Sequence, residues 1–90
     1  MLFRSSTRQV QVAFDGAVAP ELLDRTLEVS APDGHLLFRG PARIAAVGRV
    51  RVGLKRQVSA LDVRILDEAG EVLYERSTAV DADNHARIAL

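Results

Sequence analysis

Short runs in which apolar and polar residues alternate recur along this chain, and they constrain its fold more than any other feature of the sequence. Successive side chains of a β-strand point to opposite faces, so alternation places the apolar residues on one buried face. Strands of this kind keep the other face in water, as the strands of antiparallel sheets do. The pattern is clear in residues 9–14, 26–30, 49–55, 61–65 and 86–90.

Turn-forming residues separate these runs. Residues 31–34 read Ala-Pro-Asp-Gly, with proline second and glycine fourth as in a type I turn, and they predict a hairpin over residues 26–39. Residues 67–70 read Asp-Glu-Ala-Gly and predict a second hairpin over residues 61–77. In that hairpin we expect Gly70 to take the left-handed conformation of a bulged loop.

Two segments lack a clear pattern. Residues 19–25 begin Ala-Pro-Glu, which fits either a single helical turn or an irregular crossover. Residues 42–47 suit helix or strand on propensity, but the Gly-Pro before them and Gly48 after them leave only a short segment for a helix. The sequence therefore predicts a strand at residues 42–47.

The strands and turns together predict an all-β fold for residues 1–90, taken as a single domain. We expect a small antiparallel β-sandwich of about seven strands, immunoglobulin-like but without a disulfide, with a small six-stranded β-barrel as the alternative. Hydrophobic residues make up 48% of the chain, so one aliphatic core can form. The aromatic residues are too few to form a cluster that stacks bases or sugars. They are Phe3, Phe14, Phe38 and Tyr74.

The overall composition argues against several classes of protein. Twelve basic and twelve acidic residues cancel, whereas a general nucleic-acid binder would be basic. The chain has no cysteine, which excludes disulfides, thiolate metal sites and cysteine catalysis. The sequence has neither the features of a secretory signal nor an apolar run long enough to span a membrane, and it indicates no compartment.

No arrangement of residues suggests an active site or a metal site. His35 and His85 stand far apart in the sequence without the matched spacing of metal ligands. Residues 81–85 read Asp-Ala-Asp-Asn-His, which is rich in oxygen, but the glycine and the following glutamate of an EF-hand loop are missing. None of the serines lies in a nucleophile motif. We therefore expect a non-catalytic protein with no cofactor-binding or metal-binding residues.

The distribution of charge along the chain is the most informative functional feature. Residues 36–61 contain no acid but six cations, and residues 62–83 contain seven acids and only two cations. Two interpretations fit. Neighbouring strands of opposite sign could pair across a sheet, or the basic and acidic faces could meet between molecules.

The second interpretation leads to a structural or interaction module. We expect it to bind protein, above all further copies of itself, as part of a larger assembly such as a filament, coat, secretion or adhesion structure. The apolar strand at residues 86–90 would add an edge open to strand addition. The candidate partner-binding residues are Arg49, Arg51, Lys55, Arg56, Glu71 and Glu75.

A second hypothesis comes from a resemblance. Residues 4–8 read Arg-Ser-Ser-Thr-Arg, which resembles the RxxxR element of PilZ-type cyclic-dinucleotide receptors. Those receptors follow it with D/N-x-S-x-x-G. Residues 28–34 depart from that motif, since Glu28 replaces Asp or Asn and Gly34 comes one residue late. The resemblance implies a degenerate barrel that binds a cyclic dinucleotide or another anionic ligand through Arg4 and Arg8.

Overall fold

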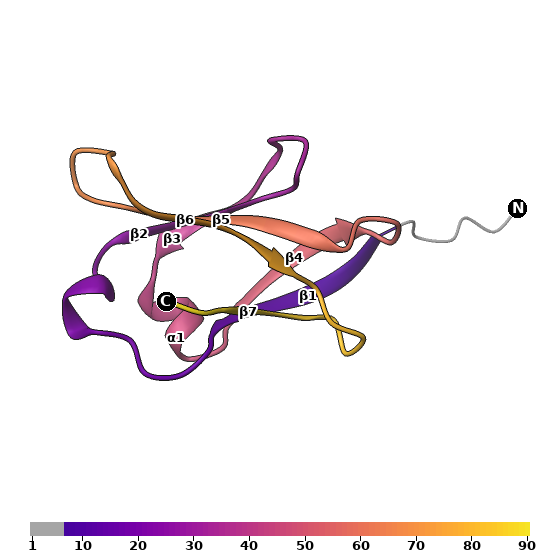
Figure 1. The fold of residues 1–90 in the computed structure, drawn as a ribbon, viewed down its shortest axis with the longest axis horizontal. Coiled ribbons are helices and arrows are strands. Elements are labelled where there is room, and N and C mark those ends of the chain that lie inside the picture. Colours follow the sequence, from indigo (N-terminus) through magenta and orange to yellow (C-terminus); the bar gives the residue numbers. More distant parts are fainter. Residues whose placement is uncertain (1–6) are drawn as a thin grey trace, which may run out of the picture.

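The structure is a computed structural model that describes residues 7–90, and it consists mainly of two β-sheets (Figure 1). The three-stranded sheet has the order β4-β1-β7, with β1 at Thr7–Phe14, β4 at Val50–Lys55 and β7 at His85–Ile88. The four-stranded sheet has the order β3-β2-β5-β6, with β2 at Thr26–Ser30, β3 at Leu36–Pro41, β5 at Ala60–Leu66 and β6 at Val72–Ala79. The prediction of an all-β fold is confirmed.

The alternating residues build the core between the two sheets. Each strand contributes its apolar face, as in β4, where Val50, Val52 and Leu54 are buried and the residues between them are exposed. The core is aliphatic, as expected from the composition, and Phe14, Phe38 and Tyr74 pack against it only partly buried. The largest side chains that are fully buried are Leu27, Leu61, Ile65, Ile88, Val10, Val12, Val29, Val50 and Val63.

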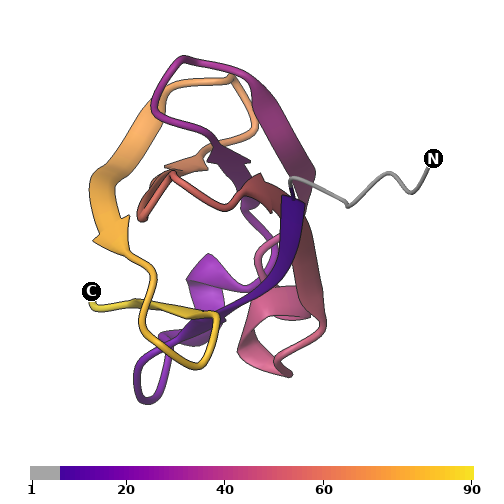
Figure 2. The same ribbon diagram turned by 90° about the vertical axis from the view of Figure 1, so that its right-hand side faces the viewer.

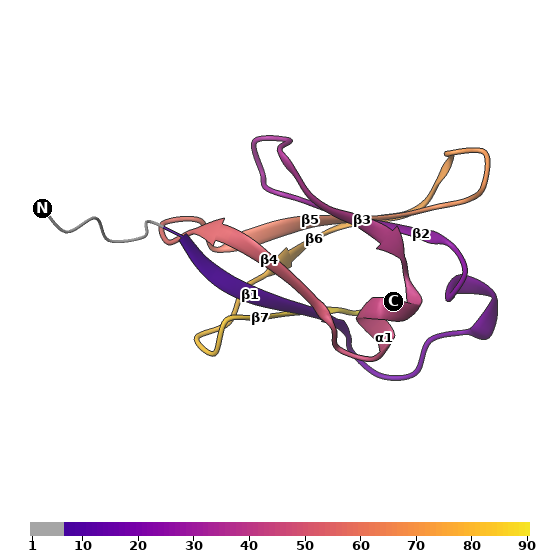
Figure 3. The same cartoon turned by 180° about the vertical axis from the view of Figure 1, so that it is seen from behind.

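The two sheets do not close into a barrel across residues 7–90. Figure 3 shows β4, β1 and β7 side by side beneath the four-stranded sheet. On one side of the molecule the edge strands are β3 and β4, and on the other side they are β6 and β7. Within residues 7–90, a backbone bridge between the edges occurs only on the β6–β7 side, where Val80, the residue after β6, pairs with Ala86.

Both predicted hairpins are present. The turn at residues 31–34 joins β2 to β3, and the turn at residues 67–70 joins β5 to β6. Gly70 has φ of 85°, the left-handed conformation predicted for it. The carboxylate of Asp67 stabilises this turn, since it accepts the backbone N–H groups of Ala69 and Glu71.

The prediction of a strand at residues 42–47 is wrong. These residues form a short helix, α1, at Arg43–Ala46. Earlier in the chain, between β1 and β2, a 3-10 turn, η1, spans Pro20–Leu22. Ala42 and Ala45 are fully buried, so the helix places two small residues against the core. The backbone N–H groups of Ala42 and Arg43 donate to the carbonyl oxygens of Arg25 and Leu23, in the segment that follows η1, and so hold the start of the helix in place.

The expectation of a wholly antiparallel sandwich is also wrong in one place. β1 pairs with β7 in parallel, with Gln11 opposite His85 and Phe14 opposite Ile88. Parallel neighbours need a long connection. Here almost the whole chain lies between the two strands, and local patterning carries no information about such a pair.

Candidate interaction surface

The side chains of β4 that point away from the core are mainly cations, and they face water. Arg51 and Lys55 alternate with the buried residues of this strand and lie opposite Gln11 and Thr7 of β1. Arg49 immediately precedes the strand and is exposed. Within residues 7–90, no carboxylate lies within ion-pair distance of Arg49, Arg51 or Lys55. Because β4 is an edge strand, these charges border an edge open to a further strand.

Other charged side chains do pair across the four-stranded sheet, although neither of the two ion pairs below joins residues 36–61 to residues 62–83. On its outer face Arg39 lies 3.6 Å from Glu28, and Arg64 lies 2.6 Å from Glu75. Glu28 and Arg64 are direct partners in the register of β2 and β5. A row of alternating charge therefore crosses all four strands, and opposite charges in such positions stabilise a sheet.

The candidate residues thus fall into two groups. Arg49, Arg51, Lys55 and Arg56 gather on β4 and at its two ends, and all four are exposed. Glu71 is an exposed residue of the turn directly before β6, and Glu75 lies within β6, where it pairs with Arg64. Figure 2 shows β4 and β6 on opposite sides of the molecule. The structure does not bring the two groups together within one molecule, since β4 and β6 belong to different sheets.

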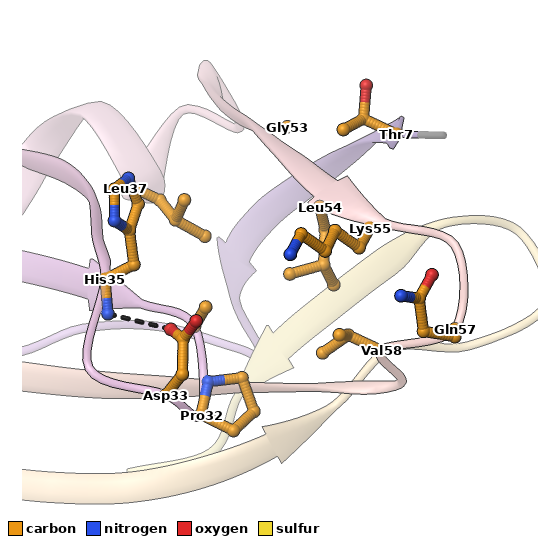
Figure 4. Close-up of a pocket in the computed structure, with 11 residues that line it drawn as sticks. Thr7, Pro32, Asp33, His35, Leu37, Gly53, Leu54, Lys55, Gln57 and Val58 are labelled. Atoms are coloured by element: carbon orange, nitrogen blue, oxygen red, sulfur yellow. Dashed lines mark hydrogen bonds between the residues drawn. The ribbon is translucent and has the colours of Figure 1, made fainter. Parts of the chain in front are cut away.

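A groove lies beside the cationic strand. Its cavity of about 560 Å³ opens between the end of β4 and the turn of the β2–β3 hairpin. His35 and Leu37 face Leu54 and Lys55 across it, and Val58 lies at one end (Figure 4). The sequence analysis missed this groove, because nothing in the pattern showed that the β2–β3 turn reaches β4.

One signal in the sequence could have drawn attention to β4. Gly53 interrupts the outward cations of this strand, yet its backbone does not need glycine, since its φ is not in the left-handed region. A Cβ atom placed there would meet nothing within 4 Å. A glycine inside a strand often marks a site where another chain approaches closely.

The C-terminal strand is less open than its sequence suggested. β7 spans only four residues, and its outer side is partly covered by the bridge between Val80 and Ala86. Beyond the strand, the Tyr74 hydroxyl donates a hydrogen bond to the carbonyl oxygen of Ala89. Of the edges considered, β4 is therefore the more accessible one.

Arg8 has a structural role in this fold. Its guanidinium donates to the side-chain oxygen of Asn84 at 3.0 Å and to the carbonyl oxygen of Val58 at 2.8 Å. Its Nε is buried and has no hydrogen-bond partner among residues 7–90. Arg4, the other arginine of the PilZ-like element, lies outside the described residues. With Arg8 occupied inside the fold and the sheets not closed, no observation favours the anionic-ligand hypothesis.

The oxygen-rich loop at residues 81–85 is a turn held by its own carboxylate. Asp81 Oδ1 accepts the backbone N–H groups of Asp83 and His85, and Arg87 donates to Oδ2. The hydrogen bond from the His85 backbone lowers the pKa of Asp81, helped by that from Asp83 and by the charges of Arg87 and His85, while partial desolvation opposes the shift. The part of the chain from Thr7 onward holds no cluster of three His, Asp or Glu residues suited to a metal ion.

Comparison with models of known protein families, with curated proteins and with solved structures finds no match for this chain. Neither helical segment in the described part of the chain has the length and apolar character that a membrane-spanning helix requires.

Proposed function

We propose that this chain is a non-catalytic interaction module, a β-sandwich that associates with further copies of itself and so takes part in a larger assembly. The observation that carries the proposal is the cationic surface of Arg49, Arg51 and Lys55 along the edge strand β4, which has no acidic partner within residues 7–90. The opposite edge of the molecule supplies acid at Glu71 and Glu75. Complementary surfaces on different sides of one molecule favour head-to-tail association.

The immunoglobulin-like part of this proposal rests on strand numbers. Seven strands divided into sheets of four and three match the division of constant-type immunoglobulin domains. The order of strands is different, because β1 pairs with β4 and β7 here. The likeness is therefore one of architecture, a scaffold that presents its edges and outer faces to partners.

The non-catalytic part rests on the environment of the polar groups. Among residues 7–90, Thr78 is the only polar residue that is buried, and the other buried residues are apolar. The lowered pKa of Asp81 arises mainly from hydrogen bonds that hold a turn. Active sites place titratable groups in clefts where burial and charge shift their pKa values.

Sedimentation velocity over a wide range of protein concentrations tests this proposal. At about 0.01 M salt the screening length is roughly 30 Å, and at about 1 M it is roughly 3 Å. We expect the mean mass to rise with protein concentration at low salt and to fall toward that of the monomer at high salt. A monomer at every concentration in both buffers would refute self-association.

A further inference from the structure

We propose that the edge strand β4 binds an extended acidic segment of a second protein, which adds antiparallel to the residues from Arg51 to Lys55. The segment carries an acid at each end, an aromatic residue at its centre and apolar residues between them. Antiparallel pairing is the more stable of the two directions per residue. The inference goes beyond the proposed function, because the partner is not a further copy of this chain and a monomer can bind it.

The backbone of β4 offers hydrogen-bonding groups along its outer side. The N–H group of Gln11 in β1 donates to the carbonyl oxygen of Asn84, directly before β7, so the backbone of Gln11 points away from β4. In an antiparallel pair, the residue opposite such a position also points away from its partner strand. Arg51 lies opposite Gln11, and Gly53 follows two residues later in the same orientation. The N–H and C=O groups of Arg51 and Gly53 therefore point to the side where an added strand would bond them.

This stretch of backbone has defined ends. Before it, the N–H group of Arg49 donates to the carbonyl oxygen of Ile44 at the end of α1. After it, the carbonyl oxygen of Lys55 accepts the N–H group of Val58 and closes the turn toward β5. The length of the added segment follows from these two bonds, since regular pairing can extend only over residues 51–55.

The charges of this edge favour an acid at each end of the segment. The side chains of Arg51 and Lys55 point to the outer face of the sheet and are exposed. Within residues 7–90, neither lies within ion-pair distance of a carboxylate. Residues directly opposite one another share a face of the sheet. Two acids four residues apart in the segment would therefore pair with both cations.

The glycine between the two cations favours an aromatic residue at the centre of the segment. A Cβ atom at Gly53 would meet nothing within 4 Å, so the outer face of β4 is open at this position. An aromatic side chain opposite a glycine of an edge strand covers the exposed backbone. The same ring would lie between Arg51 and Lys55, and cations are attracted to the face of an aromatic ring.

The groove beside β4 favours apolar residues at the two remaining positions. These positions alternate with the outward ones, so they face the interior, opposite Val52 and Leu54. Leu54 lines the groove together with Leu37 and Val58, and the latter two are only partly buried (Figure 4). Aliphatic side chains of the added strand would cover them. The segment therefore has the alternation of a strand with one buried face.

The acidic end of this chain does not supply such a segment. Glu71 and Glu75 are four residues apart, but Glu71 belongs to the turn before β6. The register of β5 with β6 shifts at Leu73, so the two glutamates do not form a regular row on one face. Glu75 also pairs already with Arg64. We therefore assign the segment to a different protein.

A synthetic peptide tests the pattern. The probe is Ser-Glu-Val-Phe-Val-Glu-Ser, acetylated and amidated, and isothermal titration calorimetry at about 0.01 M salt measures its binding to the protein. We expect saturable binding that weakens at least about tenfold when both glutamates become glutamine or the phenylalanine becomes alanine. N-methylation of the phenylalanine removes the donor for the carbonyl oxygen of Gly53 and should weaken binding at least about tenfold without changing charge.

Charge exchange tests the register and the direction. Lys55→Glu should weaken binding of the parent peptide about tenfold, because like charges then lie opposite one another. Replacing the first glutamate of the peptide by lysine should restore binding to this variant. Replacing the second glutamate gives a peptide of the same charge but places the lysine opposite Arg51, so it should not restore binding. If only the second replacement restores binding, the antiparallel register is wrong.

Two further variants complete the experiment. Arg76→Glu makes a comparable change of charge on β6, on the opposite side of the molecule, and should bind the parent peptide as the unaltered protein does (Figure 2). Gly53→Val fills the space over which the ring would lie, so it should weaken binding at least about fivefold without loss of thermal stability.

Two results would overturn the inference. One is a failure of the unaltered protein to bind the parent peptide, and the other is equal binding of the parent and the N-methylated peptide, which would show a contact of charge alone without strand addition. Neither result bears on self-association, which sedimentation velocity of the protein alone decides. Conversely, a protein that stays monomeric but binds the peptide in this pattern would refute the proposed self-association and support the inference.

Discussion

Replacing Arg8 by methionine should destabilise the fold by about 2 kcal/mol. Arg8 is the second residue of β1. It lies opposite Leu54 of β4 and on the same face of the sheet as Val10. Its two hydrogen bonds tie this strand to the β4–β5 connection at Val58 and to the turn before β7 at Asn84. Methionine keeps the apolar stem of the side chain and removes both hydrogen bonds.

The magnitude follows from three terms. Hydrogen bonds from a charged donor contribute about 1.5–3 kcal/mol each, and the two bonds of Arg8 are only partly buried, which favours the low end. The unsatisfied Nε already costs the folded state about 1 kcal/mol, and the substitution removes that cost. The difference is about 2 kcal/mol, which for a domain of this size lowers Tm by roughly 8–16 °C.

Chemical denaturation at a protein concentration low enough to keep the chain monomeric measures this change. Arg8→Lys should lose about half as much, because one ammonium group cannot hold the two acceptors in the fork of a guanidinium. Arg49→Gln is the matched control, since this arginine is exposed, and it should change stability by less than about 0.5 kcal/mol. If Arg8→Met is no more destabilising than the control, the hydrogen bonds of Arg8 do not contribute to the stability of the fold.

Three further outcomes are expected. Asn84 has φ of 62°, so Asn84→Ala should be about 1 kcal/mol less stable than Asn84→Gly in denaturant titration, and equal stabilities would contradict a left-handed residue at this position. Ile65→Ala removes a fully buried side chain from the core and should cost about 2–5 kcal/mol, whereas a loss below about 1 kcal/mol would show that the core is not packed as described. Hydrogen bonds to its charged form lower the pKa of Asp81. The charge of Asp81 therefore stabilises the fold at pH values above the ordinary pKa of an aspartate, about 4, and this stabilisation is lost as the pH falls through the lowered pKa. The stability of Asp81→Asn should therefore fall below that of the unaltered protein at neutral pH and approach it in acid, and a difference independent of pH between the two proteins would rule out this role for the charge.

The sequence contained most of the information about individual strands. Alternation correctly assigned the buried face of β4, and glycine with aspartate correctly placed the turn between β5 and β6, because both signals depend on residues a few positions apart. The same local reasoning failed at residues 42–47, where the burial of Ala42 and Ala45 against the core selects a helix. Helix and strand propensities could not distinguish the two structures there, because the contacts that favour the helix are made with residues far away in the sequence.

The candidate surface was only partly visible in the sequence. Charge counting identified the cations of β4 and the acids near β6, but it could not tell which charges find partners. Arg39 and Arg64 pair within the four-stranded sheet, whereas Arg51 and Lys55 do not pair within residues 7–90. The groove depends on the β2–β3 turn lying across from β4, a contact between segments about twenty residues apart.

The sequence by itself determined that this chain forms short strands with one apolar face and an aliphatic core, because side-chain direction along a strand follows a period of two. The tertiary structure alone decided the order of the strands, the parallel pairing of β1 with β7 and the separation of β4 from β6. Backbone hydrogen bonds are chemically the same for every strand, so the choice of neighbour comes from how all the apolar faces pack at once. That choice leaves the cations of β4 at an open edge.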